Sequence, residues 1–82
     1  MTTEEEKYYE AYFDMFSTEG WKSFMLDLQG VHDGYVIENI KDVEELYRVQ
    51  GERNVLQRIL GFQHGIEAAY ASIKEDGQSG DD

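Results

Sequence analysis

Two histidines and the acids beside them are the residues most suited to metal chemistry. His64 and Glu67 are three residues apart and share one face of a helix, and His32 directly precedes Asp33. A metal site requires these four side chains to converge, because imidazole and carboxylate ligands must surround one ion. The sequence has no second Glu-x-x-His element of the kind used by helical di-iron bundles. We therefore predict no metal ligands and no cofactor.

Residues that could act as catalytic acids or nucleophiles are present, but their context is unfavourable. Carboxylates pair at Glu4–Glu6 and at Glu44–Glu45. Acid–base catalysis needs a desolvated acid at a defined distance from a second one, whereas acids at these places are explained by the positive end of a helix dipole. No serine has a Gly-x-Ser-x-Gly context, no Gly-rich phosphate loop carries a lysine, and there is no cysteine. The sequence predicts no catalytic residue and a protein that is not an enzyme.

The charge of the chain limits its partners. Its 82 residues suffice for one small domain and carry 7 basic and 18 acidic side chains, a net charge of −11. Binding to a nucleic-acid backbone or to an anionic membrane needs clustered Lys and Arg. No apolar run approaches the roughly 20 residues that cross a bilayer. We expect neither direct nucleic-acid binding nor membrane binding.

The N-terminal third contains two apolar stripes that point in different directions. Thr3 and Glu6 have capping-box spacing, and the aromatic residues that follow recur at helical intervals. The stripe of Trp21–Leu28 is centred about 150° from the stripe of Tyr8–Phe16 on one helical wheel. A straight helix cannot direct both stripes at one core. The sequence therefore predicts two short helices.

The break between these helices is predicted at Ser17. Ser17 can cap the second helix, with Phe16 and Trp21 forming a hydrophobic staple across the cap. Gly30 is predicted to end that helix. Val31–Lys41 then forms a connection, either as an apolar loop against the helices or as a strand that pairs with the same segment of another subunit.

The last segment has the pattern of one long helix. Asp42 and Glu45 form a cap pair, and the pattern continues without proline to about Lys74. Six of eight positions in a heptad seam are apolar; the a positions are Val49, Leu56, Gln63 and Tyr70, and the d positions are Glu52, Ile59, Ile66 and Ile73. Some 30 residues would extend roughly 45 Å, which is longer than either short helix can cover. We expect leftover apolar surface to bind another copy.

Glycines within this long helix have two interpretations. Gly61, Gly65 and Ala69 are spaced by four and form a smooth ridge where a second helix could cross closely. Alternatively, the glycines mark a kinked or frayed helix, because each costs up to about 1 kcal/mol relative to alanine.

The aromatic residues of Tyr8–Phe24 also have two interpretations. They could form the core of the chain, an interface, or both in an intersubunit core.

Part of the chain resembles a group of viral proteins. Two segments are similar to small proteins encoded by short-tailed (podovirus-like) bacteriophages. The first is Phe16-Ser17-Thr18-Glu19-Gly20-Trp21-Lys22, and the second is Val43–Arg53 leading to Asn54-Val55-Leu56 and Ile59. The resemblance covers most of residues 8–73 and includes no catalytic motif. It implies a phage origin without a mechanism, and it transfers no functional residue.

Together these observations predict an all-α fold, a helical hairpin or small bundle in which two shorter aromatic-rich helices pack on one long C-terminal helix. Residues 1–74 form the domain and residues 75–82 a disordered acidic tail. We expect a homo-oligomer, most simply a dimer. The predicted interface residues are Val49, Leu56, Ile59, Gly61, Gly65, Ile66, Tyr70, Ile73, Tyr12 and Trp21.

The expected function is that of a non-enzymatic phage accessory protein. It would bind a phage or host protein through its helices, in the host cytoplasm or in the virion. The alternative is an acidic DNA mimic that inhibits a host nucleic-acid-binding protein, which the net charge of −11 favours. A DNA mimic needs a continuous stripe of fixed carboxylates, whereas Lys41–Arg58 carries no net charge because four bases balance four acids.

Overall fold

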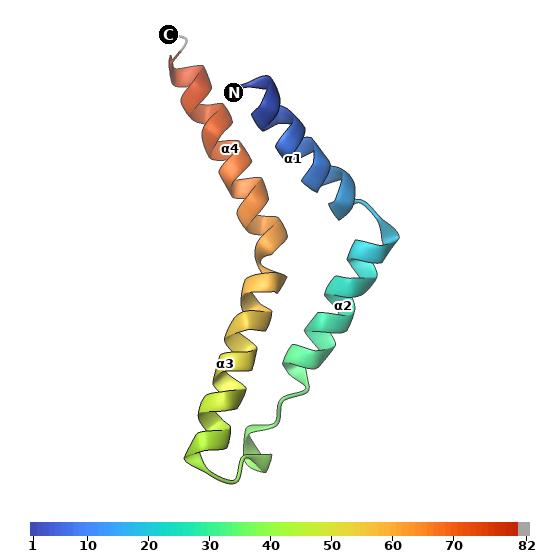
Figure 1. Cartoon of the computed structure of the whole chain (residues 1–82), viewed down its shortest axis with the longest axis vertical. Coiled ribbons are helices and arrows are strands. Elements are labelled where there is room, and N and C mark those ends of the chain that lie inside the picture. The colour runs from blue at the N-terminus through green and yellow to red at the C-terminus, as the bar shows by residue number, and fades with distance from the viewer. Residues whose placement is uncertain (81–82) are drawn as a thin grey trace.

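Within residues 1–80, four α-helices form one bent hairpin (Figure 1). The computed structural model describes residues 1–80, apart from the side chains of Ile37 and of residues 77–80. The helices are α1 (Thr3–Phe16), α2 (Glu19–Asp33), α3 (Val43–Leu60) and α4 (Phe62–Gly80), and a 3-10 turn, η1 (Ile37–Asn39), lies between α2 and α3. Within the described residues there is no strand, so the predicted all-α class is confirmed.

The hairpin has two arms that bend at the same level. α1 and α2 form one arm, and the chain returns so that α3 packs on α2 and α4 packs on α1, with the start of α1 and the end of α4 at the same end of the molecule (Figure 1). The molecule measures 59 × 28 × 16 Å. Because a helix with its side chains is about 10 Å in diameter, this thickness corresponds to a single layer of helices. Side chains between the arms are therefore covered from two sides and open to solvent from the others.

The first arm bends close to the predicted position, with different caps. Thr18 caps α2 by accepting a hydrogen bond from Trp21 N at 3.1 Å, whereas Ser17 ends α1 and its hydroxyl donates to Asp14 O at 2.8 Å. The predicted cap at Ser17 is wrong by one residue. The α1 capping box is also one residue earlier than predicted, at Thr2 and Glu5.

The second arm is two helices, so the prediction of one long C-terminal helix is wrong. α3 ends at Gly61, whose N–H donates to Gln57 O at 2.9 Å, and α4 begins at Phe62. Phe62 then packs on Phe16 and Trp21 at the bend of the first arm, with ring centroids 6.2 and 6.5 Å apart. The second arm must bend where the first does to keep this contact. Of the two interpretations of the glycines, the kinked helix applies at Gly61.

The connection is shorter than predicted. Gly30 lies inside α2, which continues to Asp33 and ends at Gly34. Asp42 caps α3 as predicted, because its carboxylate accepts a hydrogen bond from Glu45 N at 2.8 Å. At the other end, α4 reaches Gly80, and Asp81 and Asp82 of the predicted acidic tail lie outside the described residues.

The core is a narrow line of aromatic rings. Among the described residues, the buried hydrophobic side chains are Tyr9, Phe16 and Val49, which are 8%, 6% and 7% exposed. Tyr70 of α4 packs against Tyr9 and Phe13 of α1, with centroids 5.4 and 5.0 Å apart. Such aromatic pairs contribute about 0.5–1.5 kcal/mol each beyond the area that they bury. The aromatic segment thus forms the contact between α1 and α4.

Candidate protein-interaction surface

A large part of the apolar side chains remains in contact with solvent. Among the described residues, eleven large hydrophobic side chains are at least 36% exposed: Met1, Tyr8, Met15, Phe24, Leu26, Val31, Val36, Val43, Tyr47, Val55 and Phe62. Single exposed apolar residues are common on soluble proteins, whereas gathered ones mark binding surfaces. The exposed hydrophobic side chains lie closest together between α2 and α3, where Val31 and Val55 line an open groove.

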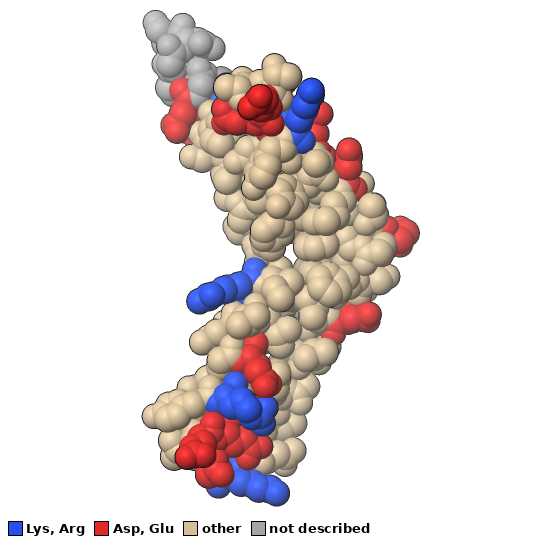
Figure 2. Space-filling model, viewed as in Figure 1, with Lys and Arg blue, Asp and Glu red and all other residues tan. Residues whose placement is uncertain are grey.

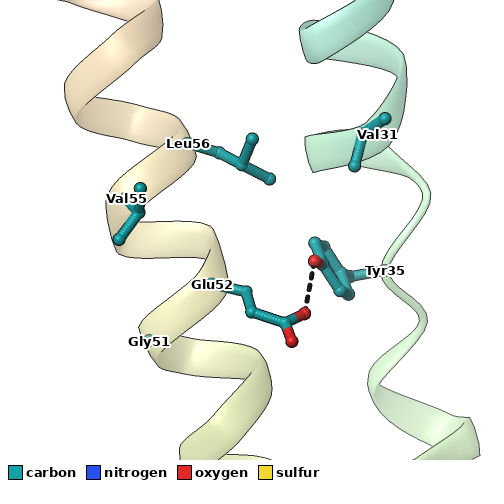
Figure 3. Close-up of a pocket in the computed structure, with 6 residues that line it drawn as sticks. All are labelled: Val31, Tyr35, Gly51, Glu52, Val55 and Leu56. Atoms are coloured by element: carbon teal, nitrogen blue, oxygen red, sulfur yellow. Dashed lines mark hydrogen bonds between the residues drawn. The ribbon is translucent and has the colours of Figure 1, made fainter.

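This groove has a volume of about 420 Å³ and lies between the two arms near the connection (Figure 3). Val31 and Tyr35 come from the end of α2 and the connection, and Gly51, Glu52, Val55 and Leu56 come from α3. Val31 and Val55 are 54% and 53% exposed. Its lining is apolar apart from the Glu52 carboxylate and the Tyr35 hydroxyl, which pair with each other.

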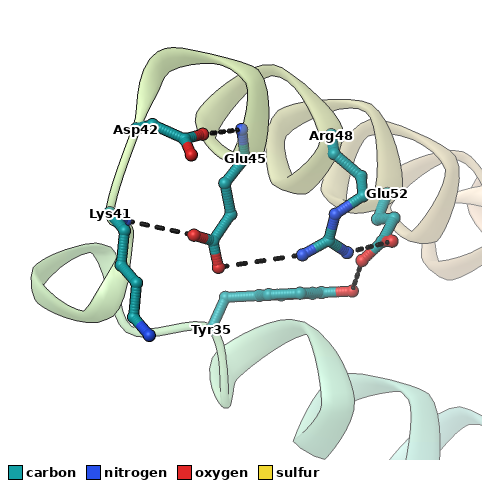
Figure 4. Close-up of polar contacts among 6 residues, drawn as sticks. All are labelled: Tyr35, Lys41, Asp42, Glu45, Arg48 and Glu52. Atoms are coloured by element: carbon teal, nitrogen blue, oxygen red, sulfur yellow. Dashed lines mark hydrogen bonds and ion pairs between the residues drawn. The ribbon is translucent and has the colours of Figure 1, made fainter.

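A chain of polar contacts holds Tyr35 in place (Figure 4). The Tyr35 hydroxyl donates to Glu52 Oε2 at 2.6 Å, and the second carboxylate oxygen, Oε1, accepts from Arg48 Nη1 at 2.8 Å. Arg48 also lies 3.8 Å from Glu45, which accepts from the backbone N–H of Lys41. The groove is therefore lined by a fixed tyrosine ring.

The same contacts shift two pKa values in opposite directions. The hydrogen bond from Tyr35, followed by that from Arg48, holds the pKa of Glu52 below its ordinary value. The carboxylate of Glu52 raises the pKa of Tyr35, because it stabilises the protonated phenol as a donor. At neutral pH the pair therefore consists of a carboxylate and a neutral phenol.

The heptad seam faces the inside of the hairpin. Val49 is buried, and Leu56, Ile59 and Ile66 are half-buried. Further along α4, Tyr70 and Ile73 are half-buried too, and Tyr70 packs on α1. None of these seam residues is among the eleven exposed hydrophobic side chains, so that exposed apolar area lies elsewhere on the molecule.

Four further residues of the predicted interface lie at or near the bends. Tyr12 and Trp21 are half-buried and contact Phe62, with centroids 5.3 and 6.5 Å away. The Trp21 indole also donates to Gln63 Oε1 at 2.9 Å. Gly61 is the cap of α3, and Gly65 is exposed, with nothing within 4 Å of a Cβ built there. The smooth ridge is thus open along α4 at Gly65.

Of the residues considered for metal chemistry, the His32–Asp33 pair and Glu67 lie in separate hydrogen-bonded groups, and His64 is exposed on α4. His32 is held by Asp33 Oδ1 at 3.1 Å and by Gln57 Nε2 at 3.3 Å, across the two arms. The hydrogen bonds from His32 and then Gln29 hold the pKa of Asp33 below its ordinary value. Glu67 accepts from Gln63 at 2.9 Å. Within residues that the structure describes, no group of three or more His, Cys, Asp or Glu side chains is arranged to hold a metal ion.

The surface that sequence reasoning missed is the outer side of α3. Val43, Tyr47 and Val55 are 59%, 67% and 53% exposed. Their signal was visible in the sequence, because these three residues and Gly51 recur every four positions. The heptad register placed the contact on the opposite side of the same helix.

No family profile, curated protein or solved structure matches this chain. Among the helices of the described residues, none is both long and apolar enough to cross a bilayer.

Proposed function

We propose that this chain is a non-enzymatic protein-interaction module that binds a protein partner through its exposed apolar surface. The observation that carries the proposal is the surface left uncovered. The accessible area is 6380 Å², whereas a compact protein of 9.5 kDa exposes about 5,000 Å². The radius of gyration is 17.9 Å, against about 12 Å for a compact chain of this length. A partner would cover area that the hairpin cannot cover itself.

The proposed setting is a phage infection, on the resemblance of Phe16–Lys22 and Val43–Arg53 to proteins of short-tailed bacteriophages. The partner is then a phage or host protein, and the module works in the host cytoplasm or in the virion. Its binding is apolar rather than electrostatic. The groove near Val31 and Val55 supports this, because its lining carries one charged group, Glu52, already neutralised by Arg48.

The test is affinity capture of the full chain from infected cells, compared with a groove variant. We expect wild type to retain a partner in 0.5 M salt and the Val31→Glu/Val55→Glu variant to lose it, because a carboxylate in an apolar contact is costly to desolvate. Gln50→Glu adds a charge to an exposed site on α3 and is the control. Circular dichroism must show the same helicity in all three proteins. Equal capture by the groove variant would overturn the proposal.

The distribution of charge separates this proposal from DNA mimicry. On the face shown in Figure 2, acidic side chains gather at the two ends and along one edge, a basic side chain projects from the other edge near mid-height, and no continuous row of acids crosses the surface between them. A mimic needs carboxylates in a continuous row, as phosphates are on a duplex. A DNA mimic would instead give capture of a nucleic-acid-binding protein that is lost in 0.5 M salt and unaffected by Val31→Glu/Val55→Glu.

A further inference from the structure

The outer face of α3 has an unusual arrangement of exposed residues around one glycine. Tyr47 and Val55 lie four residues before and after Gly51, and Val43 lies eight before it. At 100° per residue, Gly51 is about 200° from Val49, the α3 residue buried against the other arm. The centre of this face therefore lies on the side of α3 turned away from Val49, and its edge at Gly51 and Val55 borders the groove. Tyr47 is 67% exposed, which is unusual for a ring of this size.

Gly51 gives this face room for a close approach. It lies in the interior of α3, where glycine disfavours the helix, and a Cβ built on it meets nothing within 4 Å. The fold of the single chain therefore does not require glycine here. A second helix that crosses α3 at this point would require it, because only glycine lets the two backbones come close. Gly51 also lines the 420 Å³ groove, so the face and the groove are continuous.

Charge selects this face for contact between two copies. Each copy carries −11, so most pairs of faces repel, whereas Lys41–Arg58 carries no net charge. On α3, Glu44 lies seven residues before Gly51 and Arg58 seven after it. Both side chains are exposed, and among the described residues neither takes part in an ion pair within the chain. Seven residues are close to two helical turns, so both lie on the face of Gly51.

We propose that a second copy of this chain docks on the outer face of α3, antiparallel to the first, with the two-fold axis at Gly51. This places Tyr47 of each copy beside Val55 of the other, and Glu44 of each copy beside Arg58 of the other. The inference deepens the proposed function and rests on it, because it names the first protein partner. Each chain exposes about 1,300 Å² more than a compact protein of its mass, and a standard interface buries about 800 Å² per partner.

The experiment is sedimentation equilibrium of the full chain at concentrations between roughly 1 and 200 µM. This range spans a micromolar dissociation constant for the dimer. We expect wild type to approach twice 9.5 kDa. Gly51→Gln should weaken the dimer at least about tenfold, since a side chain there separates the helices. Gly65→Gln is the matched control, because Gly65 is also an open helical glycine, and it should leave the dimer unchanged.

A charge exchange tests the antiparallel register directly. Glu44→Arg and Arg58→Glu, made singly, place like charges together twice in the dimer and should each weaken it about tenfold or more. The double variant Glu44→Arg/Arg58→Glu restores opposite charges and should recover wild-type association. Helicity measured by circular dichroism must be unchanged in each.

Two outcomes would overturn the inference: a mass of 9.5 kDa up to 200 µM, or a dimer that survives both Gly51→Gln and the single charge changes. These are separable from failure of the proposed function. A monomer that still captures a foreign protein through Val31 and Val55 leaves that function standing. The chain could also form a dimer that responds to the variants as predicted and yet capture no protein from infected cells. That result supports the inference and contradicts the proposed binding of a phage or host protein.

Discussion

At the scale of single residues, the shortest described side-chain hydrogen bond between the two halves of the hairpin joins Tyr35 and Glu52. Among the described residues, its 2.6 Å separation is shorter than the other side-chain hydrogen bonds that cross between the arms. Because the phenol donates to a charged carboxylate, Tyr35→Phe should raise the pKa of Glu52 toward its ordinary value of 4.5. The rise is partial, since Arg48 still donates to the other oxygen. A carbon-detected NMR titration measures it.

This pair also makes stability depend on pH at both extremes. A lowered pKa means that Glu52 contributes stability above pH 4.5 and loses it as the pH falls through the lowered value. The raised pKa of Tyr35 contributes stability below pH 10, lost as the pH rises through the raised value. Tyr35→Phe should flatten both losses in thermal melts. Tyr47→Phe, on the outer face of α3, should show the wild-type pH profile; the same profile for Tyr35→Phe contradicts the assignment.

The second prediction at this scale concerns the only tryptophan, which reports on the bend. Gln63→Ala removes the acceptor of the Trp21 indole and should lower the free energy of unfolding by about 0.5–1.5 kcal/mol. Urea unfolding followed by tryptophan fluorescence and by circular dichroism measures this loss. Gln50→Ala, at an exposed site on α3, is the control and should change stability by less than about 0.5 kcal/mol. An equal effect of both changes would show that the indole bond contributes nothing.

At the scale of elements, two glycines of the second arm should respond differently to alanine. Gly65→Ala adds a Cβ that meets nothing within 4 Å, so it should stabilise α4 by about 0.5–1 kcal/mol. Gly61→Ala places its Cβ 3.3 Å from Gln57 O and should gain less. Urea midpoints compare the two variants. A loss of stability at Gly65 would instead support the close helix crossing that the spacing of Gly61, Gly65 and Ala69 predicts.

The elements also show how far the sequence could be interpreted. The break near Phe16 was predictable, because the two apolar stripes diverge by about 150° within one short stretch. The cap at Asp42 was predictable from its spacing to Glu45. The break at Gly61 was not, because the apolar pattern continues through it and a helix tolerates one glycine at a cost of about 1 kcal/mol. The contact of Phe62 with Phe16 decides that break, and such a contact is visible only in three dimensions.

The candidate surface was missed for a related reason. A heptad pattern identifies the helix face with the most apolar residues, and Val49 and Tyr70 lie on it. It does not tell whether that face meets the same chain or another. In the hairpin the N-terminal arm occupies it, as the contact of Tyr70 with Phe13 shows. The weaker stripe of Tyr47 and Val55 is then left exposed on the opposite side.

At the scale of the whole molecule, the single layer of helices and the net charge act in opposite directions. The exposed apolar area favours association, whereas −11 charges on 82 residues favour separation. An interface with another protein molecule would therefore be favoured where charge is balanced. The neutral segment Lys41–Arg58 includes most of α3, and the groove and the face of Gly51 both lie on that helix.

The same imbalance predicts how salt affects folding. With 18 acids against 7 bases, repulsion within the hairpin outweighs the exposed ion pairs of Arg48, so screening should stabilise the fold. The urea midpoint should rise between 0.01 and 0.1 M NaCl, as the Debye length falls from about 30 to about 10 Å. The variant Glu10→Gln/Asp14→Asn/Asp27→Asn removes three exposed charges and leaves −8. It should be more stable than wild type at 0.01 M NaCl and respond less to salt. A midpoint that falls with salt at 1 µM protein would mean that ion pairs, not repulsion, dominate the charge of this molecule.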